Sequence, residues 1–221
     1  SYHKNDELYP ADQINQIKEL VAVGDQTKVK YCWSIHLSYF FNSLPSNIES
    51  EEYQTQFNQK FDRLKAKFQQ LYDAGVRKFA VLNDDFGSGS HTEVVRLLNK
   101  LDDEFLVPKG CDNLTYCMQG YNKGWSNAGE LGAMRALNES IDLFWTGDGV
   151  NSPITQDTID FVKQQTGHEA VFWLNYPVNE HAKSGVYLGE ISHYVRDDVT
   201  GLAGAVSNPS CLTEANKVGL F

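Results

Sequence analysis

Short apolar runs of strand length alternate along this chain with longer amphipathic stretches of helix length. Runs of the first kind predict strands at 28–36, 77–83, 113–119, 141–145, 170–175 and 202–207. Several of them are continuous rather than alternating, as expected for strands that are covered on both faces. The order of the elements predicts consecutive βα units, the pattern of a parallel α/β sheet.

The helical stretches between these runs begin and end at typical capping residues. Pro10 precedes a leading helix, and Ser50, followed by two glutamates, begins a long second one. Gly75 is placed to end that second helix, and Thr155 to begin a later one. A further helix is expected over 94–105, whereas the strand at 113–119 is followed by a loop rich in Asn, Gly and Trp.

Two fold classes fit this order of elements, a (β/α)8 TIM barrel and an open doubly wound sheet. No G-x-G-x-x-G segment follows any strand, which disfavours a dinucleotide-binding sheet. Polar residues at the strand ends favour the barrel. The prediction is an α/β fold of TIM-barrel type with about six of the eight βα units, as a single domain over 1–221. Either two strands are missing from the N-terminal side, or the sheet is not a barrel.

One strand ends in adjacent carboxylates, Asp84 and Asp85. On a regular strand these side chains point to opposite faces, so both reach one cleft only if the strand breaks there. Two carboxylates a few ångströms apart cannot both ionise freely; one pKa rises, which suits a general acid near neutrality. The alternative is a solvated turn with a helix-capping aspartate.

Composition narrows the possible partners. The formal net charge of −10, with no basic stripe, argues against a nucleic acid or an anionic membrane as partner. The basic residues within 60–67 alternate with apolar ones and predict a solvated helix face. No apolar run approaches the roughly 20 residues that cross a bilayer. The four cysteines show no C-x-x-C spacing, so a zinc site is not expected. No metal and no cofactor are predicted.

Several segments together resemble the catalytic domain of glycoside hydrolase family 84, which contains O-GlcNAcases, bacterial β-N-acetylglucosaminidases and hyaluronidases. They are Tyr31-Cys-Trp-Ser-Ile-His36, Gly75-Val-Arg-Lys-Phe-Ala-Val-Leu-Asn-Asp-Asp-Phe86, Tyr121-Asn-Lys-Gly-Trp-Ser-Asn127, Phe144-Trp-Thr-Gly-Asp148, Phe172-Trp-Leu-Asn-Tyr-Pro-Val178 and Val206-Ser-Asn-Pro209. They occur in the family's order with comparable spacing, over nearly the whole chain.

The resemblance implies a retaining mechanism in which the 2-acetamido group of the substrate replaces an enzyme nucleophile. On this interpretation Asp84 stays anionic and orients the acetamido N–H. Asp85 is the general acid that protonates the glycosidic oxygen and then the base that activates water. His36, at a strand end, is expected to have a structural or supporting role rather than to bind a metal.

The resemblance also implies a set of substrate-binding residues: Tyr121, Thr146, Val150, Trp173, Asn175 and Asn208. Tyr121 would contact the acetamido group or the intermediate, and Thr146 and Val150 would line the acetamido pocket. Trp173 would form an apolar wall, and the two asparagines would bind hydroxyls. Without the resemblance, Trp173 could be a core aromatic, Thr146 a cap and Asn208 a turn residue.

The sequence departs from the family pattern in two ways. Glu180 stands where the family has an aspartate that grips the outer hydroxyls of the sugar, and its extra methylene moves the carboxylate by about 1 Å. In addition, the first two barrel strands of the family, which carry a glycine and a lysine that contact the sugar, have no counterpart. We therefore expect that a missing N-terminal segment or a second chain completes the barrel.

These observations predict a β-N-acetylglucosaminidase that removes or cleaves β-linked N-acetylglucosamine from a glycan or glycoprotein. The alternatives are a non-catalytic sugar-binding relative and an incomplete, inactive barrel fragment. A metal-dependent hydrolase with Asp84 and Asp85 as ligands is a further alternative. An extracellular location is expected, because bacterial relatives with such segments are usually exported.

Overall fold

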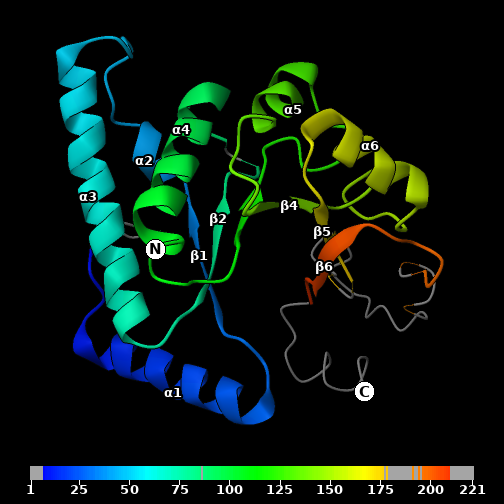
Figure 1. Cartoon of the computed structure of the whole chain (residues 1–221), viewed down its shortest axis with the longest axis horizontal. Helices are drawn as coiled ribbons and strands as arrows, with labels where there is room; N and C mark the ends of the chain where they lie inside the picture. The colour runs from blue at the N-terminus through cyan, green and yellow to red at the C-terminus, as the bar shows by residue number, and fades with distance from the viewer. Residues whose placement is uncertain are drawn as a thin grey trace. The chain divides into compact units, whose positions relative to one another are not determined.

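In a computed structural model of the protein, the described residues are 7–85, 87–176, 178, 191, 194 and 196–209 (Figure 1). The strands are β1 (Cys32–His36), β2 (Lys78–Leu82), β3 (Leu114–Cys117), β4 (Ile141–Trp145), β5 (Ala170–Leu174) and β6 (Leu202–Ser207). The helices are α1 (Ala11–Thr27), α2 (Ser38–Phe41), α3 (Glu51–Asp73), α4 (His91–Leu101), α5 (Ala128–Met134) and α6 (Gln156–Thr166), with a π-helical turn η1 (Asp102–Leu106) after α4.

The strands follow the order β1-β2-β3-β4-β5-β6 along the sheet. β1 pairs in parallel with β2, β4 with β5, and β5 with β6. The predicted α/β class with a parallel sheet is therefore confirmed. Among the described residues the sheet is open, with β1 and β6 as its edges.

Burial along the strands follows their place in this order. The strands between the edges are buried at most positions, as their continuous apolar runs predict. The edge strand β1 instead alternates, with Trp33 and Ile35 buried and Cys32 and Ser34 exposed. The other edge strand, β6, is half-buried or exposed throughout. One face of β1 thus lacks the cover that a buried parallel strand has.

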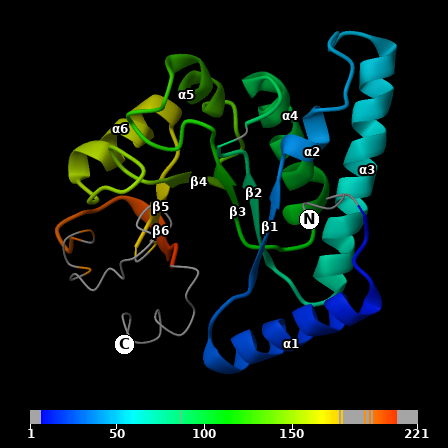
Figure 2. The same ribbon diagram turned by 180° about the vertical axis from the view of Figure 1, so that it is seen from behind.

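The chain divides into two compact units, which are described separately. The first comprises Ser1–Tyr116 and Leu137–Ile141, and the second comprises Cys117–Ala136 and Asp142–Phe221. In the first unit, α3 and α4 lie on the same side of β1 and β2 (Figures 1 and 2). Phe68 of α3 stacks on Phe79 of β2 with ring centroids 4.8 Å apart, which fastens the helix to the strand.

The ends of α3 are those that the sequence predicts. The side chain of Ser50 accepts a hydrogen bond from the Tyr53 amide, so it caps the first turn. Gly75 adopts a φ of 102°, a left-handed conformation that favours glycine. The chain then enters β2 at Lys78, and this places Asp84 and Asp85 just beyond the strand's carboxyl end.

In the second unit, α6 begins at Thr155, whose side chain accepts a hydrogen bond from the Thr158 amide. The Thr158 hydroxyl in turn accepts a hydrogen bond of 2.9 Å from the Trp145 indole N–H. Trp145 is fully buried, so it is a core aromatic. Helices α5 and α6 lie side by side (Figure 1).

Two short helices were not predicted from the sequence. α2 has four residues, too few to show helical periodicity. α5 lies in the stretch expected as loop, although Asn127 caps it by accepting a hydrogen bond from the Glu130 amide. The Asn127-x-x-Glu130 spacing resembles a capping box and is a signal that could have found this helix.

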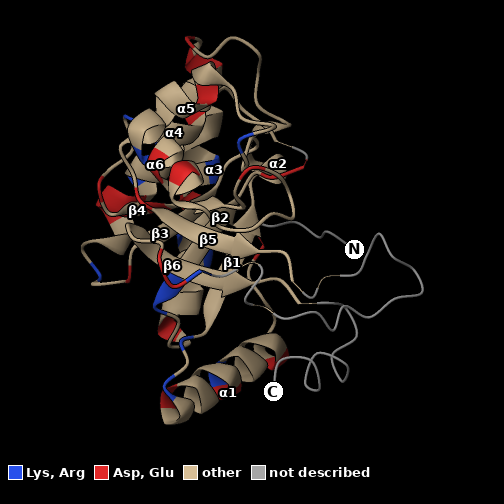
Figure 3. Ribbon diagram, turned by 90° about the vertical axis from the view of Figure 1, so that its right-hand side faces the viewer, with Lys and Arg blue, Asp and Glu red and all other residues tan. Residues whose placement is uncertain are grey.

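Charges of both signs are interspersed on the face that Figure 3 shows. The prediction of a solvated basic face over 60–67 is wrong for Lys67, which is 4% exposed. Its Nζ donates to the Glu7 carbonyl at 2.7 Å and lies 3.7 Å from the Tyr9 ring centroid. The carbonyl and the aromatic ring offset the cost of burying this ammonium. No described helix combines the length and apolar character that spanning a bilayer requires.

Candidate functional site

The segment after β2 turns sharply where the two aspartates lie. β2 ends at Leu82, so neither aspartate is part of the regular strand. Asp85 adopts a φ of 55°, a left-handed conformation that costs a non-glycine residue about 1 kcal/mol. Asn83 braces the turn, because its Oδ1 accepts a hydrogen bond of 2.9 Å from the Ser88 amide. The structure thus contains the strand break that both carboxylates need to share one cleft.

The turn is not a helix cap. The following helix, α4, is capped by Ser90, whose side chain accepts from the Glu93 amide. The alternative of a helix-capping aspartate at this turn is therefore wrong. Strained backbone at a residue with no capping role is often found at functional sites.

Asp84 lies in an environment that disfavours its charge. Its Oδ1 atom is buried and has no hydrogen-bond partner among the described residues. Burial raises the pKa of Asp84, and the neighbouring Asp85 raises it further, whereas His36 and a backbone hydrogen bond lower it. Burying a carboxylate oxygen without a hydrogen-bond donor costs folding free energy. A donor on a bound ligand could satisfy this atom.

His36 connects β1 to this turn. Its Nε2 lies 2.8 Å from the Asp84 backbone carbonyl, which can only accept, so Nε2 carries the hydrogen. Its Nδ1 accepts a hydrogen bond of 3.1 Å from the Ser38 amide. Nε2 also lies 3.9 Å from Asp84 Oδ1. The ring therefore holds the backbone of the aspartate turn in place, which agrees with the structural role predicted for it.

Four of the predicted substrate-binding residues, Val150, Trp173, Asn175 and Asn208, form a hydrogen-bonded group with Asn175 at its centre. Asn175 Oδ1 accepts from Trp173 Nε1 at 3.0 Å and from Asn208 Nδ2 at 2.8 Å. Its Nδ2 donates to the Val150 carbonyl at 2.6 Å. Trp173 is half-buried and meets Phe144 edge to face, with centroids 5.0 Å apart. Asn175 thus aligns the ends of β5 and β6 with the loop after β4.

Thr146 and Tyr121 form a second, separate hydrogen-bonded group in this unit. The Thr146 amide donates to the Tyr121 carbonyl at 3.0 Å, and its hydroxyl donates to the Gly149 carbonyl at 2.6 Å. The next residue, Gly147, has a φ of 100°, and a Cβ there would lie 2.4 Å from Ser152 Oγ. Only glycine fits this turn. Glu180, the remaining predicted binding residue, lies outside the described residues.

Comparisons with known proteins identify the family of this chain. A family model described as β-N-acetylglucosaminidase matches residues 1–221. The chain belongs to this family. The resemblance to glycoside hydrolase family 84 seen in the sequence is thereby confirmed.

Relatives of the family share the fold over nearly the whole chain. A solved structure titled "Structure of CpGH84D" is 34% identical with a TM-score of 0.84, covering 98% of this chain and 36% of that one. "Structure of CpGH84B" is 26% identical with a TM-score of 0.84, over 96% of this chain and 38% of that one. "Protein O-GlcNAcase" of Mus musculus is 23% identical over 235 residues. That match covers 97% of this chain and 24% of the mouse protein.

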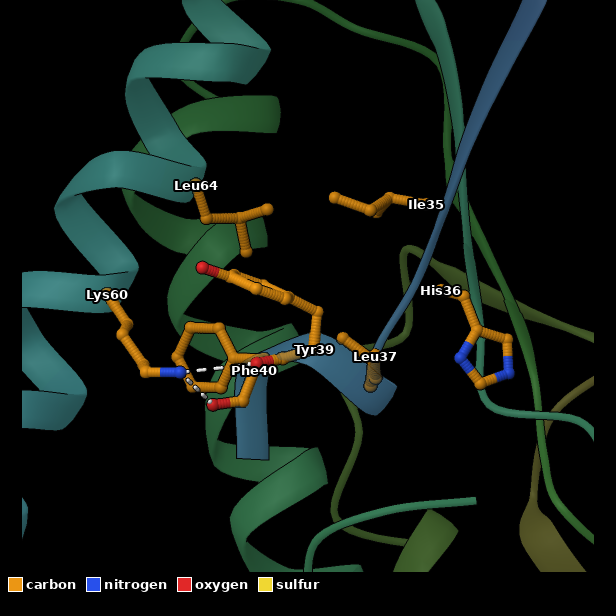
Figure 4. A pocket seen from close by; sticks show the side chains of 7 residues that line it. All are labelled: Ile35, His36, Leu37, Tyr39, Phe40, Lys60 and Leu64. Atoms are coloured by element: carbon orange, nitrogen blue, oxygen red, sulfur yellow. Dashed lines mark hydrogen bonds between the residues drawn. The ribbon is translucent and has the colours of Figure 1, made fainter. Parts of the chain in front are cut away.

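Two hollows among the described residues of the first unit are lined by neither Asp84 nor Asp85. One, of about 20 Å³, has room for about one water molecule. It lies among Leu64, Phe40 and Lys60, and the His36 ring points away from these side chains (Figure 4). A larger hollow of about 330 Å³ is lined by Tyr31 and Lys78 at the amino ends of β1 and β2. It is thus at the opposite strand ends from Asp84, and active sites of TIM barrels form at the carboxyl ends.

Glu130 is a supporting residue that the sequence did not reveal. Its side chain is 2% exposed, and its two oxygens accept from the amides of Gln119 and Gly120, each at 2.9 Å. It therefore fixes the backbone directly before Tyr121. A Cβ on Gly120 would lie 2.9 Å from Glu130 Oε2, so this contact also requires glycine. Side-chain contacts to the backbone across 10 and 11 residues leave no periodic signal in a sequence.

The central place of Asn175 leads to a stability prediction. Asn175→Asp keeps the acceptor for Trp173 and Asn208 but replaces the donor to the Val150 carbonyl with an oxygen. We expect the loss of this hydrogen bond to lower the free energy of unfolding by about 2 kcal/mol and Tm by about 5 °C at pH 7. Below about pH 4 a protonated aspartate donates again, so the difference should shrink.

Thermal unfolding monitored by circular dichroism measures this effect. Asn151→Asp makes the same chemical change at an exposed position and should leave Tm unchanged. Equal Tm values for the Asn175 variant and the parent would show that the hydrogen bonds of Asn175 do not hold these loops.

Proposed function

We propose that this chain hydrolyses β-linked N-acetylglucosamine with retention of configuration, using the acetamido group of the substrate as the nucleophile. The observation that carries the proposal is the buried Oδ1 of Asp84 at the carboxyl end of β2, which has no hydrogen-bond partner among the described residues. An acetamido N–H is a donor that would satisfy this oxygen. A sugar with a 2-hydroxyl also offers a donor, but it cannot form an oxazoline-type intermediate.

In this mechanism Asp84 would act as an anion. A hydrogen bond from the substrate N–H favours the charged form of the carboxyl, and this opposes the effect of burial on its pKa. The positive charge that develops on the oxazoline ring would stabilise the carboxylate further. Substrate binding and ionisation of Asp84 would therefore support each other.

Asp85 would transfer the proton. It is exposed and follows Asp84 in a left-handed turn. A carboxyl in contact with solvent can protonate the leaving oxygen and then take a proton from the incoming water. His36 would hold the turn through the Asp84 carbonyl, so that neither carboxylate has to be ordered during the reaction.

The residues of the second unit would bind the sugar, as the family resemblance implies. Trp173 would supply an apolar wall, and Asn208 an amide for a hydroxyl. Thr146 uses its hydroxyl proton on the Gly149 carbonyl, so toward a ligand it could only accept. Glu180 would take the place of the aspartate that holds the outer hydroxyls.

The full-length protein should hydrolyse methyl β-N-acetylglucosaminide and first release the β-anomer, which proton NMR detects within the first turnovers. A thiazoline analogue of the intermediate should inhibit it competitively. First release of the α-anomer would rule out retention. Binding of the analogue without hydrolysis would favour the non-catalytic sugar-binding alternative. Absence of both binding and hydrolysis would favour the inactive fragment.

The proposal includes two expectations from the sequence. One is a single catalytic domain over 1–221. The other is an extracellular location, where glycans are accessible. Assaying the enzyme in the culture medium and in the washed cells of the source organism would test the location.

A further inference from the structure

Trp125 differs from the other three tryptophans of the chain in its exposure. It is 56% exposed, whereas Trp33 and Trp145 are buried and Trp173 is half-buried. An indole is the largest apolar side chain, and leaving it in water forgoes the burial energy that the other tryptophans gain. A single exposed aromatic side chain is not by itself evidence of a binding site. The structure of the loop that carries Trp125 is therefore the deciding observation.

The loop of Trp125 is rigidly built. The Trp125 amide donates to Asn122 Oδ1 at 3.0 Å, and the fully buried Asn122 also accepts the Ser126 amide at 2.8 Å through its carbonyl. The amides of Lys123 and Gly124 donate to the carbonyls of residues 147 and 148 at 2.9 and 3.1 Å. The exposed ring is thus presented on a preorganised loop rather than on a flexible one.

The position of the ring relates it to the predicted sugar-binding residues. The rings of Trp125 and Tyr121 meet edge to face, with centroids 5.4 Å apart. Tyr121 is 9% exposed and bonds through its carbonyl to Thr146. Lys123 and Asp148 lie on the same pair of loops, with Nζ and Oδ1 4.0 Å apart and both side chains about half exposed. An apolar ring face with charged hydrogen-bonding groups nearby is typical of a carbohydrate subsite.

We propose that Trp125 forms a second sugar subsite, which binds the ring to which the terminal N-acetylglucosamine is attached. This inference rests on the proposed function and specifies its substrate as a glycan rather than a glycosylated protein side chain. The C–H face of a pyranose stacks on the indole, and Lys123 and Asp148 bind its hydroxyls. Because the loop is already ordered, little conformational entropy is lost when the sugar stacks on the ring.

Two substrates separate this subsite from the catalytic one. A disaccharide with a β-linked terminal N-acetylglucosamine reaches Trp125, whereas methyl β-N-acetylglucosaminide has no second ring. In the full-length protein, Trp125→Ala should lower the ratio of kcat/KM for the disaccharide to that for the methyl glycoside about tenfold. Trp125→Phe keeps a ring and should retain most of the ratio. Val107→Ala, at a residue 59% exposed in the first unit, should leave both rates unchanged.

Three outcomes would overturn the inference. One is an unchanged ratio in Trp125→Ala. Another is a tenfold loss on an N-acetylglucosaminyl-serine peptide with no loss on the disaccharide, since this would assign the ring to a protein substrate. The third applies if the parent hydrolyses neither sugar, in which case the proposed function fails and calorimetry tests the subsite instead. The disaccharide should then bind about tenfold more weakly to Trp125→Ala than to the parent, and an unchanged affinity would overturn the inference.

Discussion

Replacing Asp85 with Asn is expected to lower kcat for methyl β-N-acetylglucosaminide about a thousandfold, the scale of a lost general acid and base. Methoxide is a poor leaving group, so the glycosidic oxygen must receive a proton as the bond breaks. 4-Nitrophenoxide leaves without one, so the same variant should lose much less in the first step of that aryl glycoside. The measurement is the ratio of the two losses in single-turnover kinetics.

A matched control is available in the same unit. Asp62→Asn makes the same chemical change at an exposed residue of α3 and should leave both rates as in the parent. An Asp85→Asn variant that is as active as the parent on the methyl glycoside would remove the proposed hydrolase mechanism. Equal losses on both substrates would remove the proton-transfer role of Asp85 but leave a binding role.

Replacing Asp84 with Asn should lower kcat by two to three orders of magnitude, roughly the cost of removing one preorganised electrostatic partner of the transition state. The loss should be similar for methyl and 4-nitrophenyl glycosides, because Asp84 stabilises the acetamido group and not the leaving oxygen. The dependence on the leaving group therefore distinguishes the two adjacent aspartates. A loss confined to the methyl glycoside would assign the proton to Asp84 instead.

The Asp84→Asn variant should be more stable than the parent at pH 7. Because the pKa of Asp84 is raised on folding, the folded state binds more protons than the unfolded state at pH values between the unfolded and folded pKa. The stability of the parent therefore falls as pH rises through this window, and the deficit persists above it. Asparagine does not titrate, so the advantage of Asp84→Asn in Tm should be present at pH 7 and absent below about pH 4.

Thermal unfolding of both proteins across this pH range tests the point. A variant that is less stable than the parent at pH 7 would show that the Asp84 carboxylate has a stabilising partner. A gain in stability with a loss of activity would instead mark a residue retained for function at the expense of the fold.

Local sequence signals predicted most of the secondary structure. β4 and β6 have the predicted bounds, and Ser50, Gly75 and Thr155 cap the helices as expected. These features depend on periodicity and on residues a few positions apart. β1 was predicted from residue 28 but begins at Cys32, because Lys28 ends α1 in a left-handed conformation with a φ of 60°.

The candidate site could be predicted only in part. In the sequence, a shared cleft for the adjacent carboxylates required a break in the strand, and the turn at Asp85 provides that break. Two features of the site were not predictable: Asp84 Oδ1 lacks a hydrogen-bond partner among the described residues, and His36 donates to the Asp84 backbone carbonyl. Both depend on which distant side chains cover the turn. The same holds for Asn175, two of whose three hydrogen-bond partners lie 25 and 33 residues away.

The sequence by itself determined the alternation of strands and helices, the parallel α/β class, the family and the positions of the acidic and amide residues at the strand ends. Periodicity and capping are local properties, so they can be read from neighbouring letters. Only the tertiary structure decided that Asp84 Oδ1 lacks a hydrogen-bond partner among the described residues, that Trp125 is exposed, and that Asn175 joins the ends of β5 and β6 to the loop after β4. Burial and hydrogen bonding depend on residues that are far apart in the chain and become neighbours only when it folds.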